Sequence, residues 1–117
     1  MGRLTTHVLD TSAGLPGCGI ALELTRLDDG ARSAVASAVT NADGRCDTPL
    51  LEGEAMRPGV YELSFGAGDY FAARGDVQPE PKFLDVVVIR FGIASAGQHY
   101  HVPLLISPYG YSTYRGS

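Results

Sequence analysis

Residues 20–30 decide the fold class, and they read IALELTRLDDG. Ile20, Leu22 and Leu24 alternate with residues that are small, charged or polar, which is the two-residue period of a strand with one buried face. The Asp-Asp-Gly sequence that follows is typical of a tight hairpin turn. We therefore expect a strand that turns directly back into an antiparallel neighbour.

Similar short runs, separated by turns rich in glycine and proline, continue along the chain. We expect further strands at residues 5–10, 61–65, 85–91, 99–106 and 111–114. Residues 31–40 are ambiguous, because their alanines favour a helix and their valines a strand, but the hairpin turn before them favours the strand. Residues 68–75 predict one short helix that ends at Gly75. Short strands with at most one short helix indicate an all-β fold, an antiparallel β-sandwich.

Length and composition fit this interpretation. The chain has 117 residues, which suits one compact domain over residues 1–117, and its 44% hydrophobic and 19% charged residues are ordinary for a globular protein. Nine basic residues stand against thirteen acidic ones, for a net charge of −4. The arginines are scattered and form no basic stripe, so we expect no nucleic-acid partner.

The sequence has no membrane-spanning or signal segment and no recognised cysteine motif. No stretch is long and apolar enough to cross a bilayer, and the first residues lack the apolar core of a signal peptide. We therefore expect a cytoplasmic protein with no membrane partner. Cys18 and Cys46 form neither a C-x-x-C pair nor a zinc-ligand set. A disulfide between them stays open, but two buried thiols in a reducing compartment are the expected state.

Three histidines are the first candidates for chemistry. On the first strand, His7 shares a face with Thr5 and Leu9, and near the end of the chain His99 and His101 share a face two residues apart. These side chains could be polar residues on a solvated sheet face. They could also hold a zinc ion with an open position, or transfer a proton near neutral pH. Spacing alone does not separate these three interpretations.

A second candidate is Arg45, which follows the turn Asn-Ala-Asp-Gly at residues 41–44. A guanidinium at a rigid turn can hold an anion or stabilise a developing oxyanion, although a single arginine is more often a surface residue. We expect Asp43 to stabilise the turn through its side chain. The tyrosines near the C-terminus predict a packed sheet edge or a subunit interface. No nucleophile elbow and no glycine-rich phosphate loop is present.

Five motifs together resemble the transthyretin-like family in their order and spacing. They are HVLD at 7–10, NADGR at 41–45, GDYF at 68–71, HYHVPLL at 99–105 and YSTYRGS at 111–117. The terminal YRGS is similar to the branch of this family that hydrolyses 5-hydroxyisourate, rather than to the hormone carriers. The resemblance implies a prealbumin-like sandwich of two four-stranded antiparallel sheets with one short helix, assembled as a homotetramer, a dimer of dimers.

The same resemblance implies an enzyme of urate (purine) degradation. The expected reaction is hydrolysis of the ring amide of 5-hydroxyisourate to 2-oxo-4-hydroxy-4-carboxy-5-ureidoimidazoline, with no cofactor and no metal. The alternative is a non-catalytic carrier that holds a small ligand in the channel between dimers. Polar histidines and an arginine facing such a channel argue against a carrier of apolar ligands, because these groups would be left unpaired.

Site residues are also implied by the resemblance. The expected catalytic residues are His7, Arg45, His101 and Ser117. The expected substrate-binding residues are His7, Arg45, Tyr114 and Arg115. Of the histidines, His101 is the expected general base and His7 orients or polarises the substrate, although these two roles could be exchanged, while His99 supports His101 from the same strand face. Ser117 would supply a hydroxyl or its carboxylate to the network of water and histidine.

Overall fold

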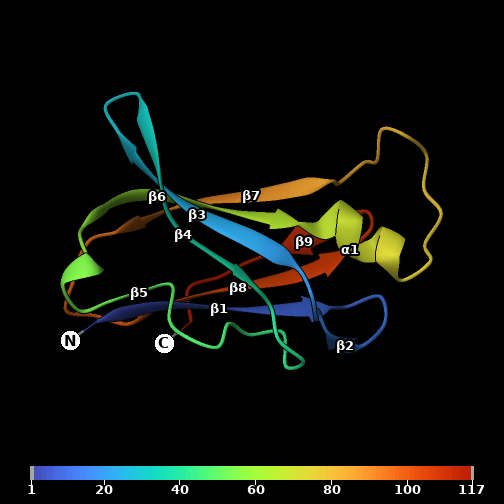
Figure 1. Ribbon diagram of the computed structural model, residues 1–117, viewed down its shortest axis with the longest axis horizontal. Helices are drawn as coiled ribbons and strands as arrows, with labels where there is room; N and C mark the ends of the chain where they lie inside the picture. The colour runs from blue at the N-terminus through green and yellow to red at the C-terminus, as the bar shows by residue number, and fades with distance from the viewer. Residues whose placement is uncertain (1, 117) are drawn as a thin grey trace.

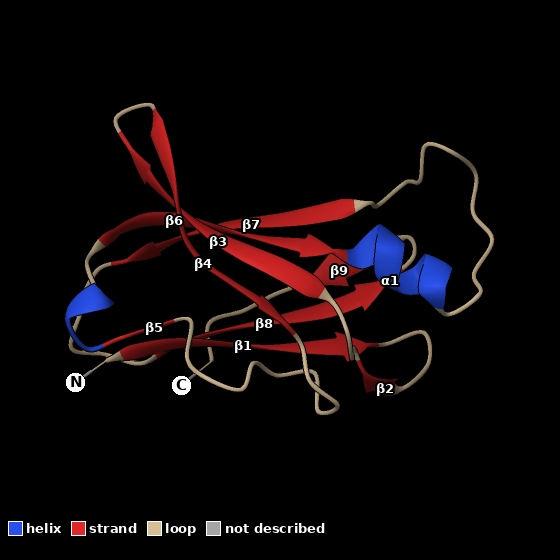
Figure 2. Ribbon diagram, viewed as in Figure 1, coloured by secondary structure: helices blue, strands red, loops and turns tan. Residues whose placement is uncertain are grey.

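Two β-sheets are stacked face to face in the computed structural model, which describes residues 2–116 (Figure 1). The strands are β1 (Arg3–Asp10), β2 (Leu15–Pro16), β3 (Ala21–Asp28), β4 (Ala31–Val39), β5 (Leu51–Glu52), β6 (Gly59–Gly66), β7 (Val86–Ile93), β8 (Tyr100–Ser107) and β9 (Gly110–Ser112). The helical segments are the short 3-10 helix η1 (Gly53–Ala55) and the α-helix α1 (Ala67–Ala73), which caps one end of the sandwich (Figure 2). The expected all-β sandwich with one short α-helix is confirmed.

We expected two four-stranded sheets, and the described residues form one sheet of four strands and one of five. Within residues 2–116 one sheet has the order β4-β3-β6-β7, and the second has the order β2-β1-β8-β9, with β5 pairing to β1 as a fifth strand. All strand pairs are antiparallel except β1 and β8, which are parallel. The chain leaves β7 at one end of the sandwich, crosses to the other sheet and enters β8 in the same direction as β1. Parallel neighbours cannot be joined by a tight hairpin, and most of the chain lies between β1 and β8.

The ambiguous segment at residues 31–40 is a strand, as expected. It is β4, which pairs antiparallel with β3 through the tight turn at Asp29 and Gly30. Both turn residues have positive φ, 42° and 85°, the backbone that a two-residue hairpin requires. The predicted helix begins one residue earlier than expected, and Gly75, at a φ of 92°, follows its end.

The core fills the space between the two sheets. Its fully buried side chains include Leu4, Val8, Leu24, Leu63, Phe65, Leu104 and Ile106. On β1 the residues alternate as the sequence predicts: Thr6 and Val8 are buried against the opposite sheet, whereas Thr5 and His7 are half-buried on the outer face. The outer face of this sheet therefore carries the histidines.

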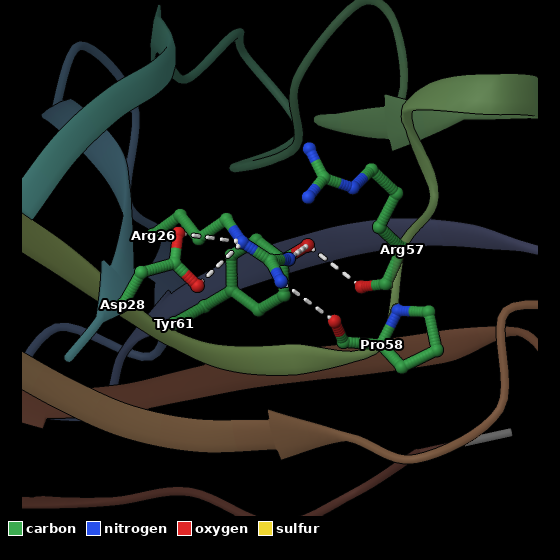
Figure 3. Close-up of polar contacts among 5 residues, drawn as sticks. All are labelled: Arg26, Asp28, Arg57, Pro58 and Tyr61. Atoms are coloured by element: carbon green, nitrogen blue, oxygen red, sulfur yellow. Dashed lines mark hydrogen bonds and ion pairs between the residues drawn. The ribbon is translucent and has the colours of Figure 1, made fainter.

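A polar cluster at the other sheet fixes the loop that precedes β6 (Figure 3). The Tyr61 hydroxyl donates to the Arg57 carbonyl at 2.7 Å and accepts a hydrogen bond from Arg26 Nη1 at 2.7 Å. Arg26 also donates to the Pro58 carbonyl and pairs through Nε with the carboxylate of Asp28. Each polar group of the buried Tyr61 is satisfied, which gives this cluster a structural role.

The cysteines correct one expectation. Both are free thiols, as expected, but Cys18 is exposed in the loop between β2 and β3. A β-carbon at the preceding Gly17 would come within 2.8 Å of Val8 and 2.9 Å of Ile20, so the chain runs against the core at Gly17, whereas the next residue, Cys18, is exposed. Cys46 is half-buried, and burial raises the pKa of its thiol. No helix within residues 2–116 is long and apolar enough to span a membrane.

Candidate active site

The parallel pairing of β1 and β8 builds the site on the outer face of the sheet. Its register places Thr5 opposite His101 and His7 opposite Pro103. Because alternate residues of a strand share a face, Arg3, Thr5 and His7 all project to the same side as His101. Residues from the two ends of the chain are therefore brought into one cluster.

A turn beside β1 adds Arg45. The side-chain oxygen of Asn41 accepts hydrogen bonds from the backbone N–H groups of Asp43 and Arg45, so Asn41 shapes this turn where we expected Asp43 to do so. Gly44 has a φ of 76°, and its carbonyl accepts a hydrogen bond from the N–H of Val8. A β-carbon at Gly44 would come within 2.3 Å of the Val8 carbonyl, so only glycine lets Arg45 reach its bridge to His7.

His7 is held by this turn. Its Nε2 lies 2.9 Å from the carbonyl oxygen of Asp43. A carbonyl can only accept a hydrogen bond, so Nε2 carries the hydrogen, and in the neutral ring Nδ1 is free to accept one. The turn thus fixes both the orientation and the neutral tautomer of His7.

His101 is half-buried, and its Nδ1 lies 2.9 Å from the hydroxyl oxygen of Thr5. Burial lowers the pKa of His101 below its ordinary value of 6.5, and the positive charge of Arg45 and the proximity of His7 lower it further. The ring is therefore unprotonated at neutral pH. A neutral imidazole with one nitrogen free can act as a general base.

A cavity of about 450 Å³ opens over these residues. It is lined by Arg3, Thr5, Thr6, Arg45, Cys46, Thr48, His99 and His101. Among residues 2–116, no carboxylate lines the cavity, and neither Arg3 nor Arg45 forms an ion pair. Its size suits a small ligand, and two unpaired guanidinium groups favour one that is polar or anionic.

Comparison with known proteins identifies the family. The HIUase/Transthyretin family model matches residues 4–116. The chain belongs to the HIUase/transthyretin family. Members named 5-hydroxyisourate hydrolase include one from Pseudomonas aeruginosa, 66% identical over the whole of this chain and 93% of the relative. Another, from Mus musculus, is 43% identical over 97% of this chain and 94% of the relative.

Solved structures of the family have the same fold. Klebsiella pneumoniae 5-hydroxyisourate hydrolase superposes with a TM-score of 0.82 at 37% identity, over the full length of both chains. Sea bream transthyretin in complex with thyroxine gives 0.87 at 28% identity, over 97% of this chain and 94% of that one. An (S)-allantoin synthase gives 0.94 at 45% identity, where 99% of this chain spans only 44% of the other protein.

The C-terminal residues typical of the hydrolase branch lie beside the cavity but do not line it within one chain. The guanidinium of Arg115 is 4.1 Å from the ring centre of Tyr100 and donates to the carbonyl of His99 at 3.0 Å. Arg115 therefore anchors the C-terminal segment to the start of β8. Tyr114 is 61% exposed. Substrate binding by these two residues stays a prediction, and Ser117 lies outside the described residues.

A zinc site has no geometric basis in the part of the chain that the structure describes. Among residues 2–116, no group of three His, Cys, Asp or Glu side chains is close enough to hold a metal ion. His7 does not line the cavity that His99 and His101 share. The zinc interpretation of the three histidines therefore finds no site in this structure.

Sequence reasoning missed five residues that line the cavity: Arg3, Thr5, Thr6, Cys46 and Thr48. The two-residue spacing from His7 could have identified Thr5 and Arg3 as members of the same strand face. The contact between Thr5 and His101 could not be predicted from this spacing, because the two residues are 96 positions apart and meet only when their strands pair.

Proposed function

We propose that this chain is a 5-hydroxyisourate hydrolase, which opens the ring amide of its substrate to give 2-oxo-4-hydroxy-4-carboxy-5-ureidoimidazoline in urate degradation. The observation that carries the proposal is the cavity in which a neutral His101 and Arg45 lie together, with no carboxylate among its lining residues in 2–116. The names of the relatives that match the full chain support the same reaction.

The geometry suits general-base hydrolysis. The Thr5 hydroxyl is hydrogen-bonded to Nδ1 of His101, so Nε2 is the nitrogen that acts as the base. It takes a proton from a water molecule while the water oxygen attacks the ring carbonyl carbon of the substrate. Arg45 stabilises the negative charge that develops on the carbonyl oxygen. The carbon–nitrogen bond then breaks, the imidazolium returns its proton to the leaving nitrogen, and the new carboxylic acid loses its proton to solvent.

The remaining residues bind and orient the substrate. His7 orients the substrate through Nδ1, because its Nε2 donates to the carbonyl of Asp43. Tyr114 and Arg115 contact the substrate, and Ser117 joins the network of water and histidine. His99 lies at the cavity wall beside His101 and supports it.

A carrier function is the alternative, since sea bream transthyretin was solved with thyroxine bound. The cavity of the present chain is lined mostly by arginine, histidine and threonine. An apolar ligand would desolvate these groups without offering them hydrogen bonds, which costs about 1–3 kcal/mol for each unpaired group. The lining therefore favours a polar substrate over such a ligand.

The direct test generates 5-hydroxyisourate from urate with urate oxidase and follows the ultraviolet band of the intermediate. Rapid decay is expected with the wild type, and decay at the spontaneous rate with His101→Asn. Arg57→Gln, which changes an exposed arginine outside the cavity, serves as the matched control and keeps the wild-type rate. Spontaneous decay in every sample would reject the hydrolase and favour the carrier.

The assembly is proposed to be a homotetramer, a dimer of dimers. Strands β7 and β9 are at sheet edges, and edge strands leave backbone groups free to pair with another chain. Exposed apolar side chains lie on or next to these edges: Phe83, Val86, Val88, Tyr109 and Tyr111. Light scattering should give the mass of a tetramer for the wild type and a smaller mass for Phe83→Asp, and a wild-type monomer would reject the assembly.

We propose that the protein is cytoplasmic and that its partner is a small molecule. Two free thiols are the normal state in a reducing compartment, which supports cytoplasmic residence. The partner is the small-molecule substrate, with no nucleic acid and no membrane surface, and the proposed reaction needs no cofactor.

A further inference from the structure

The contact between Thr5 and His101 has a function beyond holding two strands together. The two residues face each other in the parallel register of β1 and β8, and the Thr5 hydroxyl oxygen lies 2.9 Å from Nδ1 of His101. Among residues 2–116, Thr5 is the only group that hydrogen-bonds the His101 ring. Without this hydroxyl, no hydrogen bond would fix the rotation of the imidazole about its bond to the β-carbon.

A hydroxyl suits both protonation states of a general base. Nδ1 carries a hydrogen both in the neutral ring whose Nε2 is free and in the imidazolium, and the hydroxyl oxygen accepts a hydrogen bond from it in both states. When Nδ1 carries the hydrogen, the lone pair of Nε2 is the one directed to the cavity. The bond to Thr5 then persists while Nε2 gains a proton from water and loses it to the leaving nitrogen.

The absence of charge on Thr5 matters as well. A carboxylate at this position would favour the imidazolium and raise the pKa of the ring. Among residues 2–116, the charged and titratable groups around His101 are instead Arg45 and His7, with Arg3, His99 and Cys46 at the cavity wall. Burial, then Arg45 and His7, disfavour the imidazolium, so a neutral hydroxyl orients the ring and leaves it unprotonated at neutral pH.

We propose that Thr5 is a positioning residue for His101, whose hydroxyl holds Nδ1 and directs Nε2 toward the substrate. The proposal rests on the hydrolase function, because it assigns to His101 the role of general base. Thr5 lies two residues before the motif HVLD and outside every motif that carries the family resemblance.

Paired substitutions separate the hydroxyl from the shape of the side chain. Thr5→Val removes the hydroxyl and keeps the volume, whereas Thr5→Ser keeps the hydroxyl. We expect kcat to fall by about 10- to 100-fold in Thr5→Val, because a misplaced catalytic group costs rates of this order, with KM within about twofold of wild type. Thr5→Ser should keep kcat within about threefold. Equal losses in both variants, or none in Thr5→Val, would overturn the proposal.

The matched control is Thr11→Val, since the Thr11 hydroxyl also forms a hydrogen bond with β8, to the Ile106 carbonyl, but lies outside the cavity. It should leave kcat and KM unchanged. If Thr5→Val does not fold, Thr5→Ala provides the same test, and melting temperatures identify any variant that has lost stability instead of orientation.

Nitrogen-15 NMR of the His101 ring tests the positioning independently of turnover. The wild type and Thr5→Ser should give the same Nδ1 and Nε2 shifts, and Thr5→Val should give shifts of exchanging tautomers. Unchanged ring shifts in Thr5→Val would contradict the proposal. If the wild type shows hydroxyl-dependent shifts but no turnover of 5-hydroxyisourate, the hydrolase function fails while the orientation of the ring by Thr5 holds.

Discussion

Gly116 lies directly against His101. Its backbone N–H donates to the His101 carbonyl at 2.7 Å, and the two residues form an isolated β-bridge. A β-carbon added at Gly116 would come within 2.8 Å of His101 Cδ2 and 3.1 Å of its Cβ. The C-terminal segment, anchored by Arg115 on Tyr100, therefore forms one wall against the imidazole of the proposed base.

Gly116→Ala should impair catalysis more than stability. The added methyl group forces the His101 ring to move, and a displacement of this kind costs about 10-fold or more in kcat. The melting temperature should change little, because the ring lies at the surface of the cavity and can shift. The control is Gly97→Ala, where a β-carbon meets nothing within 4 Å. Full kcat in Gly116→Ala would show that the ring need not hold this position.

The pH dependence should follow the pKa of His101. Burial, then Arg45 and His7, hold this pKa below 6.5, so the base stays unprotonated and kcat/KM should stay high until the pH falls below that value. Arg45→Gln removes a positive charge and should raise the pKa of His101. NMR titration of the ring measures both midpoints without requiring turnover. A wild-type midpoint at or above 6.5 would contradict the stated effect of burial and charge.

Arg3 should contribute to substrate binding. It lines the cavity with no ion-pair partner among residues 2–116, so its charge is available to a polar or anionic ligand. We expect Arg3→Gln to raise KM several-fold and to weaken the dependence of kcat/KM on salt, because screening then acts on one guanidinium fewer. Arg57→Gln is the control. An identical salt dependence in Arg3→Gln and wild type would exclude Arg3 from binding.

Local patterns predicted the strands well and the site only in part. The alternation of Ile20, Leu22 and Leu24 predicted β3, and the turn after it predicted the hairpin to β4. Both signals lie within a few residues of each other. The pairing of Thr5 with His101 joins opposite ends of the chain, and no local pattern encodes which strands become neighbours or that this pair is parallel.

The contacts of side chains near the two ends of the chain could not be predicted from the sequence either. The motif YRGS indicates the hydrolase branch, but it does not say that Arg115 packs on Tyr100 and donates to His99. Stacking of a guanidinium on an aromatic ring depends on tertiary placement. The same applies to Arg3, which has no motif around it and enters the site because β5 and β8 flank β1.

Acid should remove the stabilisation provided by Asp10. This buried carboxylate accepts hydrogen bonds from Ser12, Ala13 and Tyr70, and Arg74 lies 3.5 Å away. Burial alone would raise its pKa, but the hydrogen bonds from Ser12, Tyr70 and Ala13 outweigh burial and lower the pKa below 3.8. Its stabilisation is therefore complete above that value and lost as the pH falls through the lower, folded-state pKa.

Asp10→Asn should thus lower the free energy of unfolding by about 2 kcal/mol at neutral pH, the scale of hydrogen bonds to a charged group. Tyr70 stays a donor in the wild type, since burial and then Asp10 raise the pKa of its hydroxyl to about 12. Urea unfolding at neutral pH and at pH values below 3.8 measures the effect. A difference between the two proteins that does not narrow in acid would contradict the role of the charge.

Tyr61→Phe should separate stability from activity. The hydroxyl of Tyr61 donates to Arg57 and accepts from Arg26, and the ring is 2% exposed (Figure 3). Its removal leaves a carbonyl and a guanidinium hydrogen unpaired, at a cost of about 1–3 kcal/mol. The urea midpoint should fall, and the slope of unfolding free energy against urea concentration should not change, because the fold and the surface that it buries stay the same.

The turnover of Tyr61→Phe should equal that of the wild type at temperatures where both are folded, because no residue of this cluster lines the cavity. Thr5→Val should show the opposite pattern, with kcat reduced and the urea midpoint retained. The two variants would then separate a residue that stabilises the fold from one that positions the catalytic base. A parallel loss of kcat and stability in Tyr61→Phe would instead mean that the loop before β6 transmits its order through β5 to Arg3 and the cavity.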